Sequence, residues 1–70
     1  MKFTKELKKM LSVGNRIRER GDILHIRGVV DDEWIVYKQW SLRKQRWIYA
    51  VDWWYRFQLS LEDGVLEVIK

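Results

Sequence analysis

The amino-acid sequence predicts a mainly β domain of the α+β class, with a short N-terminal helix followed by an antiparallel meander of about five strands. Three observations predict this class. Apolar residues follow a helical spacing only before Gly14, turn-forming residues then separate short apolar segments, and one long segment alternates with a period of two. In that segment every odd position from Trp47 to Leu61 is apolar, which is typical of a strand with one face on a core. A twisted sheet of this length tends to curl, so we expect a small SH3-like barrel or open roll with the odd positions inside.

The 70 residues are predicted to form a single domain, with the helix in residues 1–14 and the strands in residues 15–70. A chain this short has a small core, and with no Cys and a single His it has neither disulfides nor an evident metal site to support that core. Five Trp, three Tyr and two Phe residues take that role, because each large aromatic side chain can bury about 150–250 Å². We therefore expect an aromatic core and no cofactor or bound metal.

The first element is a short amphipathic helix over residues 4–13. Thr4 is its candidate N-cap, and Gly14 with Asn15 ends it. Its apolar residues share one stripe: Phe3, Leu7, Met10 and Leu11. A helix of about ten residues is not stable alone in water, so this stripe should pack on the sheet.

Strand segments separated by turns follow the helix. The first is short and highly charged, which suits a sheet edge, and the second contains Gly28 as a predicted bulge or bend. The turns are marked by Gly21-Asp22, Asp31-Asp32, Ser41 to Gln45 and Glu62 to Gly64. The strand segments themselves are residues 16–20, 23–30, 33–40, 46–62 and 65–69.

The long segment 46–62 has a second interpretation. Asp52 can cap a helix that runs from Trp53 to about Leu61, with Gly64 just past its end. Aromatic enrichment and the unbroken alternation favour a strand, although a usual strand has only about five or six residues. A break near Asp52 is expected in either case.

The predicted meander sorts the charged turns to two ends of the sheet. The chain has 14 Lys and Arg against 10 Asp and Glu, a formal net charge of +4, which permits binding to nucleic acid or to acidic proteins. One end should collect the basic residues Arg20, Arg43, Lys44 and Arg46. The other end should collect Asp31, Asp32, Glu33, Glu62 and Asp63. The molecule would then be a charge dipole.

The basic end is the predicted binding site, because Trp40 and Trp47 flank the basic loop. Cationic side chains beside aromatic planes can bind phosphates and stack on bases, or anchor an acidic protein surface. The predicted contact residues are Trp40, Arg43, Lys44, Arg46, Trp47 and Arg20. A purely structural interpretation stays open, in which Trp40 and Trp47 form a cross-strand pair and the loop is simply solvated.

A second apolar patch is expected opposite the main core, formed by Ile48 and Trp54. Such a patch needs a cover. The N-terminal helix is the economical one, and a second copy of the chain or a target protein are the alternatives.

The sequence does not favour catalysis. His25 is the only imidazole, and Ser12, Ser41 and Ser60 fall in different elements without a triad signature. The run Asp31 to Glu33 lacks the spacing of a calcium loop, so we interpret it as a solvated turn. Charges scattered through the first 14 residues leave no apolar run for a signal peptide or membrane span, and the lack of Cys fits a cytoplasmic protein.

Three runs of the sequence resemble a group of small uncharacterised proteins encoded by bacteriophages and prophages. They are GDILHIRGVVDDEWIVYKQW (21–40), KQRWIYAV (44–51) and FQLxLEDGVL (57–66). The resemblance implies an accessory phage protein in the host cytoplasm, and no functional residues carry over from it.

The functional expectation is a non-enzymatic protein-interaction module that binds and modulates a host or phage protein, for example a defence or regulatory factor. The alternative is a small SH3-like nucleic-acid-binding protein that adds Arg16, Arg18 and Arg20 to the same basic loop.

Overall fold

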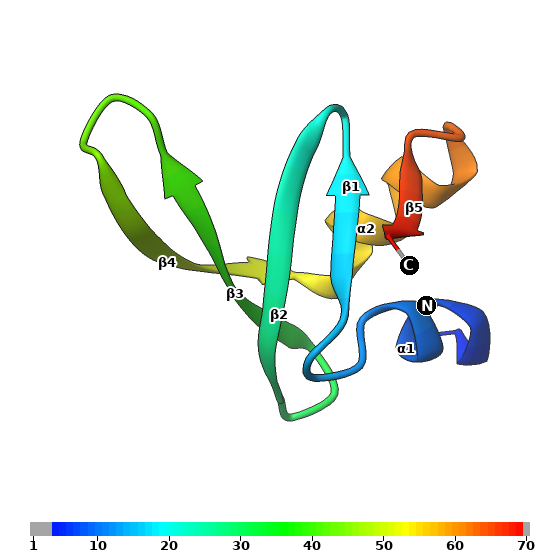
Figure 1. Ribbon diagram of the computed structural model, residues 1–70. Helices are drawn as coiled ribbons and strands as arrows, with labels where there is room; N and C mark the ends of the chain where they lie inside the picture. The colour runs from blue at the N-terminus through cyan, green and yellow to red at the C-terminus, as the bar shows by residue number, and fades with distance from the viewer. Residues whose placement is uncertain (1–3, 70) are drawn as a thin grey trace.

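The computed structural model describes residues 4–69 and has the predicted fold class, mainly β with one antiparallel sheet of five strands and a short N-terminal helix (Figure 1). A second helix lies between the fourth and fifth strands. In chain order the elements are α1 (Lys5–Met10), β1 (Arg16–Glu19), β2 (Asp22–Val30), β3 (Trp34–Ser41), β4 (Arg46–Trp53), α2 (Trp54–Glu62) and β5 (Leu66–Ile69).

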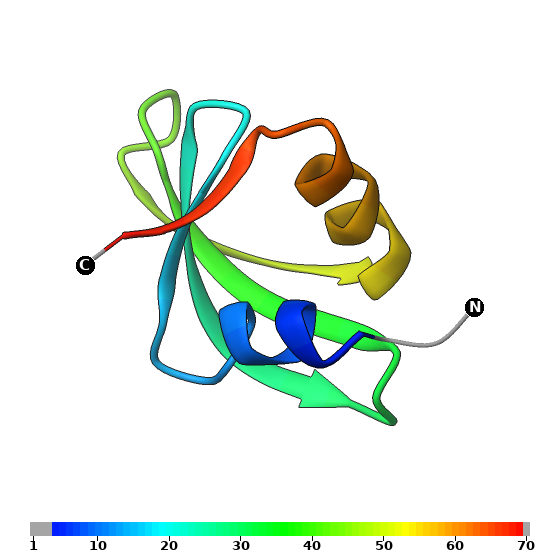
Figure 2. The same cartoon turned by 90° about the vertical axis from the view of Figure 1, so that its right-hand side faces the viewer.

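The sheet has the strand order β4-β3-β2-β1-β5. The first four strands form the predicted meander, whereas α2 carries the chain back so that β5 pairs with β1, with Leu66 opposite Glu19. The sheet is open, because β4 and β5 are its two edges. Both helices that the structure describes lie on the same side of this strongly twisted sheet (Figure 2), which we call the inner face.

Helix α1 is short because both of its ends are closed by local hydrogen bonds. The Thr4 hydroxyl accepts a hydrogen bond from the backbone N–H of Leu7 at 3.2 Å, as predicted for an N-cap. The side-chain amide of Asn15 donates to the carbonyls of Lys9 and Met10, both at 3.1 Å. The buried stripe of the helix, which includes Leu7, packs it on the sheet, because a helix of this length is not stable alone in water. The predicted contact of Phe3 lies outside the described residues.

The segment 53–61 is a helix, so the preferred interpretation of one long strand through residue 62 is wrong. Pairing of β4 with β3 ends at Trp53, which lies opposite Trp34, the first residue of β3. Further extended residues would leave backbone groups unpaired, whereas a helix satisfies them internally. Trp54 and Phe57 are buried at helical spacing on α2. The alternative helix therefore forms, although Trp53 is its N-cap and Asp52 makes no cap.

The predicted core face of β4 is also wrong. The buried residues of β3, Ile35 and Tyr37, lie on the face that carries the even positions of β4, including Ala50. The odd positions from Trp47 to Trp53 lie on the opposite, outer face. Helix α2 decides between the faces, because its first residue is only 4% exposed and the helix folds back over the even positions. The complete core is Leu7, Leu11, Ile17, Leu24, Ile26, Ile35, Tyr37, Trp54, Phe57 and Leu66.

A pair of truncations tests this assignment of faces. We expect Ile35→Ala to lower the free energy of unfolding by about 2–5 kcal/mol, because it removes a fully buried side chain. The control Val51→Ala, on an outer-face side chain that is 56% exposed, should cost less than about 1 kcal/mol. Urea unfolding followed by circular dichroism measures both values, and equal losses would contradict the assignment.

Candidate functional site

The outer faces of β3 and β4 form one continuous stripe of large side chains, which we call the outer stripe. It consists of four cross-strand rungs, in which each residue of β3 lies opposite its partner on β4. From one end to the other the rungs are Trp34–Trp53, Val36–Val51, Lys38–Tyr49 and Trp40–Trp47. Both described helices lie on the inner face (Figure 2), and α2 contacts the outer stripe at the Trp53 ring, through Trp54 and Tyr55.

The rings of the outer stripe are exposed to an unusual degree. Its four Trp side chains are between 43% and 51% exposed, and Tyr49 is 64% exposed. Because a large aromatic side chain has about 150–250 Å² to bury, five half-exposed rings present on the order of 500 Å² of apolar surface. Contiguous apolar patches of this size on soluble proteins are often binding surfaces. The outer stripe is therefore the candidate functional site.

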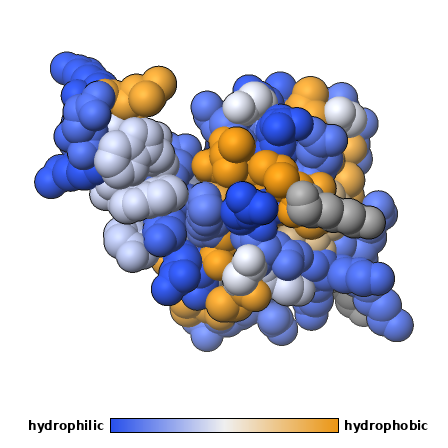
Figure 3. Space-filling model, in the orientation of Figure 1, coloured by the Kyte–Doolittle hydropathy of each residue, from blue (hydrophilic) through white to orange (hydrophobic). Residues whose placement is uncertain are grey.

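The tip of the β3–β4 hairpin is the end at which the sequence predicted binding. Trp40 and Trp47 form the expected cross-strand pair, with ring centroids 5.5 Å apart at 79°. Arg43 and Lys44 are exposed in the turn beside them, and Arg46 opens β4. Figure 3 shows this hairpin as an arm standing out from the body, with hydrophilic residues and a hydrophobic patch at its end and residues of intermediate hydropathy below them. We call Arg43, Lys44 and Arg46 the basic tip.

A second group of cations lies beside the same rings. The His25 ring contacts Trp47 edge-on with centroids 5.0 Å apart, and Lys38 Nζ lies 4.5 Å from the Trp47 centroid. Burial lowers the pKa of His25, and the positive charges of Lys38, Arg16 and Arg27 lower this pKa further. Within residues 4–69 these three cations, the cationic cluster, have no carboxylate at ion-pair distance. This part of the outer face therefore carries uncompensated positive charge.

Sequence reasoning named Arg16 but missed the other members of the cationic cluster. Lys38 lies two residues before Trp40. This spacing was the one sequence signal that placed the two side chains on the same face of a strand. The nearness of Arg27 and His25 to that face depends on the register between β2 and β3, where a bulge lies between Ile26 and Gly28. A bulge of this kind shifts the side-chain alternation, and Gly28 was the only sign of it in the sequence.

The opposite end of the outer stripe is acidic. Asp31, Asp32 and Glu33 form the turn between β2 and β3, next to the Trp34–Trp53 rung, and we call them the acidic turn. Asp32 lies 3.7 Å from Lys8 of α1 in an exposed ion pair. The predicted separation of charge is therefore present along the β3–β4 hairpin, with the basic tip at one end and the acidic turn at the other.

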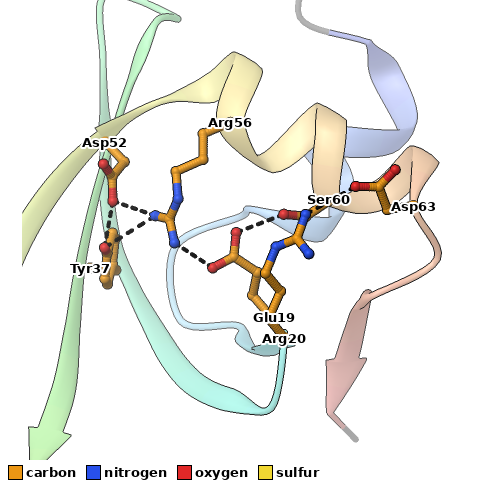
Figure 4. Close-up of polar contacts among 7 residues, drawn as sticks. All are labelled: Glu19, Arg20, Tyr37, Asp52, Arg56, Ser60 and Asp63. Atoms are coloured by element: carbon orange, nitrogen blue, oxygen red, sulfur yellow. Dashed lines mark hydrogen bonds and ion pairs between the residues drawn. The ribbon is translucent and has the colours of Figure 1, made fainter.

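Arg20 and Asp63 do not follow the predicted sorting of charges. They were placed at opposite ends of the sheet, but Arg20 Nη2 lies 3.0 Å from Asp63 Oδ2 (Figure 4). The reason is that β5 pairs with β1, which brings the turn after α2 beside the β1–β2 turn. Arg20 is thus paired with a carboxylate, and it lies in the turn between β1 and β2, whereas the basic tip belongs to the β3–β4 hairpin.

A shallow pocket of about 330 Å³ lies between β1 and β5 and is lined in part by Arg18 and Arg20. Both arginines are paired with carboxylates, Arg18 with Glu67 at 2.7 Å and Arg20 with Asp63. The pocket therefore offers little charge to an anionic ligand. In the described part of the chain, the residues of the cationic cluster have no such carboxylate partners.

The chain was compared with known protein families, with curated proteins and with solved structures. None of them matches it. The candidate site therefore rests on the geometry and chemistry of its own residues. Within the described part of the chain, no group of three His, Cys, Asp or Glu is placed to hold a metal ion, and no helix has the length and apolarity to cross a membrane.

The second predicted patch, Ile48 and Trp54, belongs to the inner side of the molecule. Trp54 is buried in the core cluster with Leu7 of α1 and with Leu11, the C-cap of that helix, so the N-terminal helix is part of its cover. Ile48 is half-buried on the same face of β4. These two residues are therefore structural in the folded chain.

A buried polar network fixes α2 on the inner face (Figure 4). The Glu19 carboxylate, only 2% exposed, accepts hydrogen bonds from Arg56 at 2.5 Å and from the Ser60 hydroxyl at 2.8 Å. Arg56 also pairs with Asp52, and the Tyr37 hydroxyl donates to the same Asp52 carboxylate at 2.5 Å. Within residues 4–69 every buried side-chain N or O atom has a partner. The network therefore joins α2 to β1, β3 and β4, and we assign it a structural role.

The Tyr37 hydroxyl makes this network sensitive to alkaline pH. Burial raises the pKa of Tyr37 above its ordinary value of about 10, and the hydrogen bond to Asp52 raises it further, while Arg56 opposes the change. The folded state therefore holds this proton more tightly than the unfolded chain. The resulting stabilisation is complete below about pH 10 and is lost as pH rises from there through the folded-state pKa.

We expect the free energy of unfolding to fall above about pH 10, and Tyr37→Phe to reduce the slope of that fall. Urea unfolding measured in steps from about pH 8 to about pH 11.5 gives the slope. Leu59→Ala, at an exposed side chain of α2 that does not titrate, is the control and should keep the wild-type slope. The same slope in both variants would show that Tyr37 is not responsible.

Proposed function

We propose that the chain is a non-enzymatic protein-interaction module whose contact surface is the outer stripe. The observation that carries this proposal is the exposure of four Trp and one Tyr ring on the sheet face opposite the helices. Trp and Tyr are the residues that most often dominate the binding energy of protein interfaces. Trp40 and Trp47 are already held in a cross-strand contact, and the Trp53 ring contacts Trp54 and Tyr55, so little side-chain entropy is lost when a partner covers these three rings.

The charges at the two ends of the outer stripe define the chemistry of the partner. A polyanion that ran the length of the stripe would be repelled at the acidic turn. A folded protein can present an apolar centre with an acidic patch opposite the basic tip and a basic patch opposite the acidic turn. The resemblance to phage and prophage proteins makes a host protein with such a surface, for example a defence or regulatory factor, the partner that we propose.

Capture from bacterial lysate on the immobilised chain tests this function. We expect Trp47→Ala to weaken capture of a specific protein by about 30-fold or more, which corresponds to a loss of about 2 kcal/mol at a hot spot. Leu59→Ala, on an exposed apolar residue of α2 away from the outer stripe, is the matched control and should capture as well as wild type. Mass spectrometry and titration of the recovered protein measure the difference. Recovery of no specific protein, or equal recovery by both variants, would count against the proposal.

A second candidate function, binding of single-stranded nucleic acid, is favoured by the cationic cluster alone. Arg16, Arg27 and Lys38 lie beside the rings of His25 and Trp47, and none of the three has a carboxylate partner among residues 4–69. Cations that track a phosphate backbone beside rings that stack on bases are the common means of binding single strands. Arg18 and Arg20, which the sequence suggested for this role, are each paired with a carboxylate, so we propose the cationic cluster in their place.

Fluorescence anisotropy with a labelled single-stranded oligonucleotide tests this second function. The logarithm of the affinity should fall linearly with the logarithm of the salt concentration. Arg27→Gln should make this slope shallower by the amount that about one phosphate contact contributes. Arg20→Gln, which removes an already paired cation, is the control and should leave the slope unchanged. Bound phosphates would also raise the pKa of His25, the only imidazole in the chain, which a proton NMR titration can follow. No binding at about 50 mM salt would exclude this function.

A further inference from the structure

We propose that the outer stripe binds a second copy of the chain, so that the free protein is a two-fold symmetric dimer with its β3–β4 hairpins antiparallel. This inference rests on the proposed function, because it uses the same contact surface and names its occupant. The partner chemistry derived above is an apolar centre with charged patches of opposite sign at its ends. The chain itself presents that chemistry along the outer stripe.

The symmetry of the dimer follows from the charges on the hairpin. Two faces that pack against each other are related by a two-fold axis lying between them. An axis that runs across the outer stripe reverses the order of the rungs, so the Trp40–Trp47 rung of one copy meets the Trp34–Trp53 rung of the other. Each basic tip then lies near the acidic turn of the second copy. An axis along the stripe would instead bring like charges together at both ends, which is unfavourable.

The centre of the outer stripe is compatible with this arrangement. Lys38 is the only charged member of the four rungs. When the axis passes between the two middle rungs, Lys38 faces Val36 of the second copy. The Lys38 residues of the two copies are then offset along the strands by about two residues, roughly 7 Å. Its ammonium group already lies over the Trp47 ring, so its stem can pack while its charge stays near the edge of the stripe. The single cation therefore does not prevent two stripes from packing.

The available area is sufficient for a specific but modest dimer. Five half-exposed rings contribute on the order of 500 Å² from each copy, and the exposed Val30 and Val51 side chains add to this. The total of roughly 1,000 Å² or more is at the lower limit for a specific interface. We therefore expect a dimer that dissociates on dilution.

Sedimentation equilibrium over a range of concentrations measures the dimer, and variants at the two ends of the outer stripe test its geometry. The tip variant is Arg43→Glu with Lys44→Glu. The turn variant is Asp31→Asn, Asp32→Asn and Glu33→Lys, with Asn chosen because Asp31 and Asp32 have positive φ angles of 53° and 52°. Each variant makes both ends of the outer stripe carry the same sign, so each should dissociate at least about tenfold more readily than wild type. Circular dichroism confirms that the variants remain folded.

A chain with both sets of substitutions is the decisive variant. It again carries opposite charges at the two ends, so an antiparallel dimer should recover, and Leu59→Ser on α2 should dimerise like wild type throughout. The inference is overturned if the wild-type chain is monomeric at about 500 µM, if the end variants dimerise unchanged, or if the combined variant fails to recover. A monomer that still captures a lysate protein through Trp47 overturns only this inference. A monomer that captures nothing overturns the protein-interaction function as well, and a monomer that binds the oligonucleotide assigns the face to nucleic acid.

Discussion

The ion pair between the buried Glu19 carboxylate and Arg56 is the constraint on which the rest of the structure depends. A carboxylate is costly to remove from water unless a cation and hydrogen-bond donors replace its hydration. Glu19 obtains both from Arg56 and Ser60 only when α2 lies on the inner face. With α2 in that position, Trp54 and Phe57 complete the core, and both described helices lie on the inner face of the sheet. The exposure of the outer stripe is thus a consequence of how the inner face is closed.

The aromatic residues consequently serve two separate purposes. Tyr37, Trp54 and Phe57 fill the inner side, where burial stabilises a chain that has no Cys. Trp40 and Trp47 contribute a cross-strand contact to the β3–β4 hairpin, and the rings of the outer stripe leave about half of their surface in water. Under the proposed function, Trp40 and Trp47 are ordered before the partner binds.

Sequence reasoning predicted the N-terminal helix, the turns and the positions of β1 to β4, because these depend on local periodicity and turn-forming residues. It could not determine which face of β4 is covered, because Trp47 and Ile48 begin two apolar faces and alternation does not say where the helices lie. After Trp53 the sequence favoured a strand over a helix. The length of β4 is limited by the point at which its partner β3 ends, and the residues of β4 do not reveal that point. The basic tip was found from the sequence. The cationic cluster was not, because it requires the bulged register between β2 and β3.

The distal half of the β3–β4 hairpin has a consequence for how this protein can change. Pairing between β2 and β3 stops at His25 and Lys38, and no residue of the buried core of the described chain lies from Gln39 to Tyr49. Substitutions in this arm are therefore expected to leave the packing of the core intact, whereas substitutions on the inner face disturb it. Under the proposed function, the contact residues of the arm and the residues of the core are separate sets of positions, so the arm could change its partner while the scaffold is kept.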